Sequence, residues 1–229
     1  YHSGQGGVSG GTTETMFTIG PLPKEKRDSF LLNPENSVSE KQRKLSKDGF
    51  EIKQIENTDS YSGIGLMSFA NTRVVRRSSA LYDADQRSYG SDFIFKEIGS
   101  YPSKRSARFA SFGLIFAFLV ISTPLRYIVR RFLPKPGEGP DKETRENGWF
   151  KGLFKVEAED GEIKYFQIYG DGDPGYKATA QMVCESAITL AISDELVVGG
   201  VLTSAYGLGN PLLDRLIKSG IKFEEVIYN

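Results

Sequence analysis

Residues 153–170, LFKVEAEDGEIKYFQIYG, decide the fold because four polar residues join two alternating apolar runs here. Asp160 and Gly161, at the centre of the joint, suit a tight turn between antiparallel strands. Phe154 and its alternate neighbours fall on one face of the first run, and Phe166 and its alternate neighbours share a face of the second. The stretch therefore predicts a β-hairpin.

A glycine pattern follows the hairpin directly, in the stretch GDGDPG at residues 170–175. It fits G-x-G-x-x-G, the spacing of a dinucleotide-binding loop that brings a pyrophosphate to a helix N-terminus. Asp171 and Asp173 lie where negative charge would have to approach, and Pro174 removes a backbone donor. The pattern therefore predicts a tight turn from strand to helix, and we expect no cofactor to bind at it.

The residues after this turn predict two helices and a closing strand. Residues 176–193 form an amphipathic pattern, and Cys184 on its apolar side is expected to be packed and inert. A second helix is predicted over 211–219, because Asn210 is a good N-cap and a proline follows it. Gly220 fits the C-terminal cap of this helix.

The start of the chain reads as a glycine loop that enters a short helix, in the stretch SGGTTETMFTI at residues 9–19. Ser9 or Thr12 is suited to cap this helix. Backbone N–H groups at such a start can hold an anion, which makes Gly10, Gly11 and Thr12 candidate site residues. An ordinary loop-to-helix junction is the alternative interpretation.

Residues 21–60 are polar and irregular, and we expect an exposed loop with at most a short helical turn. The following stretch, residues 68–90, predicts a helix or strand that packs onto the core. It contains Arg76 and Arg77, which point either to solvent or to an anionic ligand.

The most apolar part of the chain is RFASFGLIFAFLVISTPLRYIVRRF, residues 108–132, in which positions 109–125 carry no charge. Such a run is at the short end for a spanning helix. A buried core helix, a spanning helix and a segment that dips into one leaflet or a lipid-droplet monolayer are the three alternatives. Basic residues lie on both sides of the run, and since they suit anionic headgroups they favour the third. The expected membrane contacts are Phe109, Phe112, Leu114, Ile115, Phe116, Phe118 and Leu119.

Composition excludes several classes of function. The 229 residues include 29 basic and 29 acidic side chains, so nothing indicates broad affinity for nucleic acid. One cysteine rules out an internal disulfide framework. With His2 as the single histidine, no metal site of the usual zinc type and no Ser-His-Asp or Cys-His pair is expected. Because the chain starts with Tyr1, we expect it to be a fragment of a longer protein.

Four segments in order resemble one family: SGGTTETMFTI, NTRVVRRSSALY, GDPGYKATAQMVCESAITLA and GGVLTSAYGLGNPLLDRLIKSGIKF. They look like the C-terminal half of saccharopine dehydrogenase-like oxidoreductases, which include the bacterial trans-acting enoyl reductases. The resemblance implies an N-terminal Rossmann domain that binds NAD(P) and is absent from residues 1–229, so this part alone is expected to bind no cofactor. It also implies membrane or lipid-droplet association in eukaryotic members, glycolipid synthesis in bacterial ones, and a possible homodimer.

The fold class expected is therefore α+β, a mixed or antiparallel sheet packed with helices, with a membrane-associating segment at about 104–131. The first functional hypothesis is the substrate and assembly part of an intracellular, membrane-associated oxidoreductase that reduces a C=C or C=N bond of a lipid-type small molecule. In it, Gly10, Gly11 and Thr12 face the cleft, while Arg76 and Arg77 hold an anionic group. The alternatives are a non-catalytic lipid-droplet or membrane protein that retains the fold, and a soluble domain of unrelated function.

Overall fold

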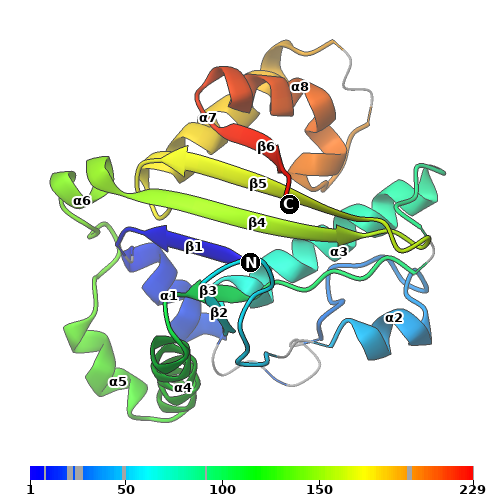
Figure 1. The fold of residues 1–229 in the computed structure, drawn as a ribbon. Helices are drawn as coiled ribbons and strands as arrows, with labels where there is room; N and C mark the ends of the chain where they lie inside the picture. The colour runs from blue at the N-terminus through cyan, green and yellow to red at the C-terminus, as the bar shows by residue number, and fades with distance from the viewer. Residues whose placement is uncertain are drawn as a thin grey trace.

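The computed structural model describes residues 1–7, 9–19, 23, 28–47, 50–90, 92–194 and 198–228. Its strands are β1 (His2–Gln5), β2 (Tyr61–Gly63), β3 (Gly99–Tyr101), β4 (Trp149–Glu157), β5 (Ile163–Asp171) and β6 (Lys222–Val226). They form one six-stranded sheet in the order β2-β3-β1-β4-β5-β6 (Figure 1). β1 and β3 are parallel and the other neighbouring pairs are antiparallel, so the predicted α+β fold with a mixed sheet is confirmed.

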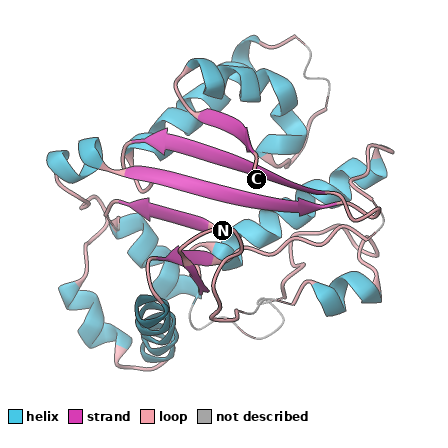
Figure 2. Cartoon of the chain, in the orientation of Figure 1, coloured by secondary structure: helices cyan, strands magenta, loops and turns pink. Residues whose placement is uncertain are grey.

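Helices connect and cover the strands. They are α1 (Gly10–Ile19), α2 (Glu40–Leu45), α3 (Ser68–Ala84), α4 (Lys104–Ile121), α5 (Arg126–Val129), η2 (Arg130–Phe132), α6 (Lys142–Asn147), α7 (Lys177–Ile192) and α8 (Ser204–Lys218). Figure 1 shows α3 running behind β4 and β5, with α7 and α8 beside β6. In the same orientation, Figure 2 shows that no helix crosses the front of the long strands.

The predicted hairpin is the longest pairing in the sheet. β4 and β5 pair over their full length, and Phe154 lies directly opposite Phe166, as the alternation predicts. The turn closes with a hydrogen bond of 2.9 Å from the Ala158 N–H to the Glu162 carbonyl. Gly161 there has a φ of +87°, which glycine adopts at little cost. One face of the hairpin is apolar, and the other carries polar side chains such as Gln167.

The predicted C-terminal helices and closing strand are confirmed with one refinement. α8 starts earlier than predicted, at Ser204, and is kinked at Gly209, whose φ is 48° and ψ −138°. The second half therefore begins at Asn210 and Pro211, where the cap signal places a helix start. Gly220 follows the helix end with a φ of +105°, and β6 comes next.

The first hundred residues depart from expectation in two ways: the region 21–60 is buried in part, although a short helical turn was expected there, and one strand was not predicted. The polar region 21–60, of which part lies outside the described residues, contains α2 and buries Phe30 and Ile55. The strand β1 was not foreseen, because its residues His2–Gln5 lack any apolar alternation. It nevertheless lies inside the sheet, between β3 and β4. Its backbone groups form the hydrogen bonds to both neighbours, and its side chains carry no pattern that predicts them.

Candidate functional site

The start of α1 is a capped helix junction, as predicted. The Ser9 hydroxyl accepts a hydrogen bond of 2.9 Å from the Thr12 N–H and lies 2.9 Å from the Thr12 hydroxyl. The Gly10 N–H donates to the Glu138 carbonyl over 2.9 Å. A Cβ at residue 10 would lie 1.8 Å from the Lys135 carbonyl oxygen, so the loop before α6 closes over this glycine. Gly11 is exposed, and its place in a substrate cleft stays a prediction.

The glycine pattern forms the strand-to-helix turn that the sequence predicts. Asp173 is fully buried between β5 and α7. Its carboxylate accepts hydrogen bonds from the Gly7 N–H over 2.9 Å and the Tyr176 N–H over 2.7 Å. A Cβ at Gly6 would lie 2.0 Å from the same carboxylate. The chain's own carboxylate therefore fills the position at this helix start that an external anion would take.

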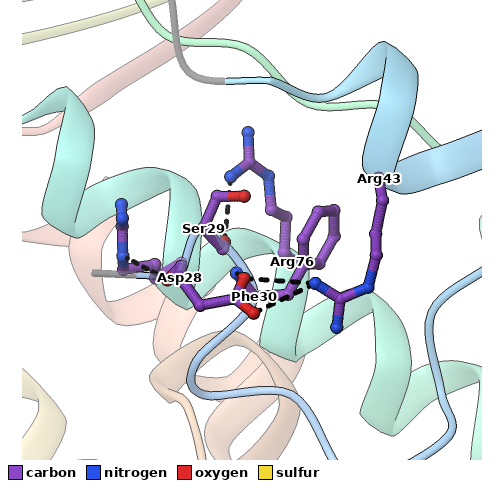
Figure 3. A network of polar contacts seen from close by, with 6 residues as sticks. Asp28, Ser29, Phe30, Arg43 and Arg76 are labelled. Carbon is purple, nitrogen blue, oxygen red and sulfur yellow. Dashed lines mark hydrogen bonds and ion pairs between the residues drawn. The ribbon is translucent and has the colours of Figure 1, made fainter. Parts of the chain in front are cut away.

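Arg76 lies inside the protein, which differs from the expected solvent or ligand contact. It is 3% exposed, and its guanidinium donates to the carbonyls of Ser29, Ser46 and Phe95 over 2.9, 2.7 and 3.1 Å. Its guanidinium carbon lies 4.9 Å from the centre of the Phe30 ring (Figure 3). These contacts tie the start of the irregular region to α3, and an additional substrate contact remains a prediction.

A carboxylate completes this network. Asp28 pairs with Arg43 of α2 at 3.0 Å, as Figure 3 shows. The backbone N–H of Phe30, together with the Arg43 guanidinium, holds the pKa of Asp28 below its ordinary value. Arg77 lies apart from the network and donates to the carbonyls of Leu32 and Val201. The structure therefore does not bring Arg76 and Arg77 together with Gly10, Gly11 and Thr12 in one described cavity.

The helix α4 presents its apolar side chains to solvent. Phe109 is 80%, Phe112 63%, Phe116 68% and Leu119 59% exposed. Only one side of the helix is packed, through Ala107, Ser111 and Ile121. The interpretation of this run as a buried core helix is therefore wrong. Leu114 is half-buried, while Ile115 and Phe118 are exposed at about 40%.

The exposed surface continues beyond α4, where Tyr127 and Ile128 of α5 and Phe132 of η2 are also exposed. No single helix among the described residues is long and apolar enough to cross a membrane. The segments Lys104–Ile121 and Arg126–Phe132 meet the length and composition criteria only together, and a bend of 108° separates them. We call the exposed apolar side chains of both segments the α4 surface.

Cys184 is exposed on α7, so the prediction that it is packed was wrong. The helix buries only Ala178 and Thr189, and it leaves Val183, Leu190 and Ile192 in solvent. Periodicity identified the helix but did not indicate which side is covered, because apolar or small residues occur almost all round it.

A cavity of about 240 Å³ lies at the N-terminus of α3, and no sequence pattern predicted it. Its walls include Phe50, Ile64, Phe69 and Ile98, and Lys47 and Lys96 contribute two amines. We call it the α3 cavity. The residues that line it are far apart in the sequence, so no local spacing could have revealed it.

A polar triplet borders this α3 cavity. The Nδ1 atom of His2 lies 3.1 Å from Glu97 Oε1, and the Asn71 amide donates to the same oxygen over 2.9 Å. Burial alone would raise the pKa of Glu97, but the partners His2 and Asn71 outweigh it and hold the pKa below its ordinary value. His2, the single histidine, lies on β1, and Glu97 lies just before β3, the strand that runs parallel to β1.

Comparison with known proteins identifies relatives among the mycobacteria. The Mycobacterium tuberculosis protein Rv2449c, provisionally named a trans-acting enoyl reductase, is 31% identical over 96% of this chain and 57% of its own length. The trans-acting enoyl reductase of Mycobacterium bovis BCG is 29% identical over 93% of this chain and 55% of its own length. That of Mycobacterium ulcerans is 32% identical over 70% of this chain and 40% of its own length.

The chain is homologous to part of the trans-acting enoyl reductases. It spans a little more than half the length of the first two enoyl reductases described above. No protein-family model matches it, and no solved structure matches it. The homology is to oxidoreductases, which agrees at that level with the resemblance seen in the sequence.

Proposed function

We propose that this chain is the lipid-facing part of an NAD(P)-dependent oxidoreductase of the enoyl reductase type, which acts on a lipid-type substrate at a membrane or lipid-droplet surface. The cofactor would be bound by the part of the full-length protein outside this chain, as the resemblance to saccharopine dehydrogenase-like proteins implies. The homology supports the reaction class, and the α4 surface supports the lipid-facing role.

The single observation that carries the lipid-facing role is the exposure of the α4 surface. Four large apolar side chains of α4 are 59–80% exposed, and an apolar surface of this kind marks an interaction site. Basic residues flank it in the sequence, namely Lys104, Arg105, Arg108, Arg126, Arg130 and Arg131, of which Arg130 pairs with Glu14 at 2.6 Å. Each cation near an anionic membrane contributes about 1 kcal/mol to binding, in addition to the burial of the apolar side chains.

The geometry favours a helix that lies in the interface over one that spans it. The bend of 108° after α4 turns the second apolar segment away from the axis of the first. A bent pair of this kind can place both apolar sides at one surface while its cations reach the headgroups. The rest of the fold would then remain in water, with the sheet and its helices outside the lipid.

Flotation with vesicles tests this role. The chain is mixed with phosphatidylcholine vesicles that contain roughly 30% of the anionic lipid phosphatidylserine. The fraction of the chain that floats with the vesicles is then measured. Replacing Phe109, Phe112 and Phe116 together by serine is expected to lower the floating fraction at least about tenfold, because three large apolar contacts are lost. The side chains are exposed, so the circular dichroism spectrum should be unchanged.

The matched control uses α7, whose Val183, Leu190 and Ile192 are exposed to similar extents of 61%, 68% and 63%. Their triple replacement by serine removes exposed apolar area from a helix without the ring of cations. It is expected to leave flotation as it is. Equal loss in both triple variants, or no flotation of the unchanged chain, would contradict the lipid-facing role.

A test of the proposed oxidoreductase activity requires the full-length protein. NADPH consumption in the presence of a 2-enoyl lipid ester in vesicles is the measurement. Turnover that falls with the α4 triple variant, but persists with a detergent-dispersed substrate, is expected. Flotation without any NADPH consumption by the full-length protein would instead favour the non-catalytic alternative.

A further inference from the structure

The helix α7 exposes an apolar side along most of its length. Ala178 and Thr189 are buried on the side of the helix that faces the fold. The large side chains exposed on the rest of its surface are Val183, Ile188, Leu190 and Ile192, three of them by 61–68%. Large apolar side chains that gather on one exposed surface mark an interaction site.

Small residues run along the middle of this exposed side. They are Ala180, Cys184, Ala187 and Ala191, all of them exposed. Their separations of four, three and four positions place them in one row along the helix, as in the seam of a coiled coil. At 3.6 residues per turn, Val183 and Leu190 lie on one flank of the row and Ile188 lies on the other. The side is therefore low in the middle, with larger apolar side chains on both flanks.

The charged residues of α7 are already paired within the chain. They are Lys177 and Glu185. Lys177 pairs with Glu146 of α6, and Glu185 pairs with Arg215 of α8 at 2.8 Å. An uncharged side of this kind has no attraction for anionic headgroups or for a charged protein surface. It matches another uncharged apolar surface, and a second copy of α7 presents one of the same length and shape.

We propose that α7 is the contact between two copies of this chain, in which the two α7 helices pack antiparallel about a two-fold axis. A two-fold axis is the commonest symmetry of homo-oligomers, and it brings the same surface of both copies together. The row of small residues lets the helix axes approach to about 8 Å, the close end of the usual range. Antiparallel packing also places the partly positive start of each helix beside the partly negative end of the other.

Sedimentation equilibrium between about 1 and 100 μM measures the association, since a pair of single helices is a small interface of moderate affinity. The expected result is an equilibrium that approaches twice the single-chain mass of 25.4 kDa. Replacing Val183, Leu190 and Ile192 together by serine should weaken dimerisation at least about 100-fold, because each copy loses three large apolar contacts. A chain that stays monomeric throughout, or a triple variant that dimerises like the unchanged chain, would overturn the proposal.

Ala187→Leu separates close helix packing from general apolar attraction. Leucine suits a helix nearly as well as alanine, and the exposed position leaves room for it in the single chain. Because it adds bulk to the row, dimerisation should weaken at least about tenfold. Ala158→Leu, the same change at an exposed position outside α7, is the matched control and should have no effect. Dimerisation that Ala187→Leu leaves equal or makes tighter, or that the control weakens equally, would overturn the close helix pair.

Cys184, the single cysteine of the chain, reports the geometry directly. With the two-fold axis between Cys184 and Ala187, the two cysteines lie about 4.5 Å apart along the helix axes. A short bismaleimide should therefore join two copies covalently, with a yield at least about tenfold lower in the α7 triple variant. Cys184→Ser combined with Lys151→Cys moves the thiol to the polar face of β4 and should abolish the product. Equal yields from both thiol positions would indicate random collisions and sink the proposed contact.

The dimer is tested apart from the lipid-facing role and does not depend on it. The triple serine variant of α4 should dimerise like the unchanged chain, even though it no longer floats with vesicles. Failure of flotation with dimerisation intact would remove the lipid-facing role and leave the α7 contact. A dimer that is lost in the α4 variant and kept in the α7 variant would place the contact on α4 and overturn the inference.

Discussion

The turns that lead into α7 and α3 differ in which groups accept hydrogen bonds from the backbone N–H groups there. The turn before α7 buries Asp173, whose carboxylate accepts two backbone N–H groups. The turn before α3 has no such side chain, and the Ser68 hydroxyl there stays without a partner among the described residues. The first turn is held by its own carboxylate, whereas at the second the Ser68 and Ala70 N–H groups donate to the backbone carbonyls of Gly65 and Met67, and one hydroxyl is left over. A match to the glycine pattern therefore says less about ligand binding than whether protein groups already hydrogen-bond the helix start.

The strongest test of this comparison is Asp173→Ala, which should lower the free energy of unfolding by about 3 kcal/mol. The change removes the acceptor of two half-buried backbone N–H groups, each worth about 1–3 kcal/mol. Urea denaturation measures it. Asp171→Ala is the control, since Asp171 is exposed, and a change below about 1 kcal/mol is expected there. Equal effects of the two alanines would remove the structural role assigned to Asp173.

A middle-sized effect is expected at the polar triplet beside the α3 cavity. The folded state lowers the pKa of Glu97, so the stability it contributes is fully present above the ordinary carboxyl pKa of about 4.3 and is lost as the pH falls through the lower folded value. Glu97→Gln should cost about 1–2 kcal/mol at pH 7 and flatten this acid limb. Urea denaturation at pH values from neutral to acidic measures both. If the free energy of unfolding falls equally steeply with decreasing pH in the variant, the loss is due to other carboxyl groups.

The smallest effect completes the comparison. Ser68→Ala should change the free energy of unfolding by less than about 0.5 kcal/mol, because no hydrogen bond within the described structure is lost. Thermal unfolding of this variant beside Asp173→Ala would then show one helix start that depends on its polar side chain and one that does not. A loss above about 1.5 kcal/mol for Ser68→Ala would mean that its hydroxyl already has a partner inside the protein.

Local patterns predicted the parts of the fold that local physics determines. The β4–β5 hairpin, the turn at Asp173, the break in α8 just before Pro211 and the end of α8 before Gly220 follow from alternation, turn residues and caps. Burial could not be predicted in the same way. Cys184 and the phenylalanines of α4 are apolar in the sequence and exposed in the structure, because exposure depends on which other elements cover a helix.

The candidate site likewise contains some contacts that local sequence patterns predict and others that they do not. Ser9 and Thr12 were the two candidate caps of α1, and the structure shows that Ser9 accepts the hydrogen bond from the Thr12 N–H. Arg76 was noticed as a charged residue, but its carbonyl partners come from three separate segments that no spacing relates. The pairing of His2 with Glu97 likewise depends on the parallel contact between β1 and β3, which residues 2–5 do not signal.

The inner place of β1 also sets an order of assembly in time. Gln5 pairs with Trp149, so β1 finds its antiparallel neighbour some 144 positions further along the chain. A ribosome adds about 5–20 residues per second, so that partner emerges about 7–29 s after β1. The hairpin itself forms within about 1–10 μs once it is made. Until β4 is made, the edge of β1 that later pairs with β4 therefore has no partner strand, and an unpaired edge of this kind is prone to pair with other chains.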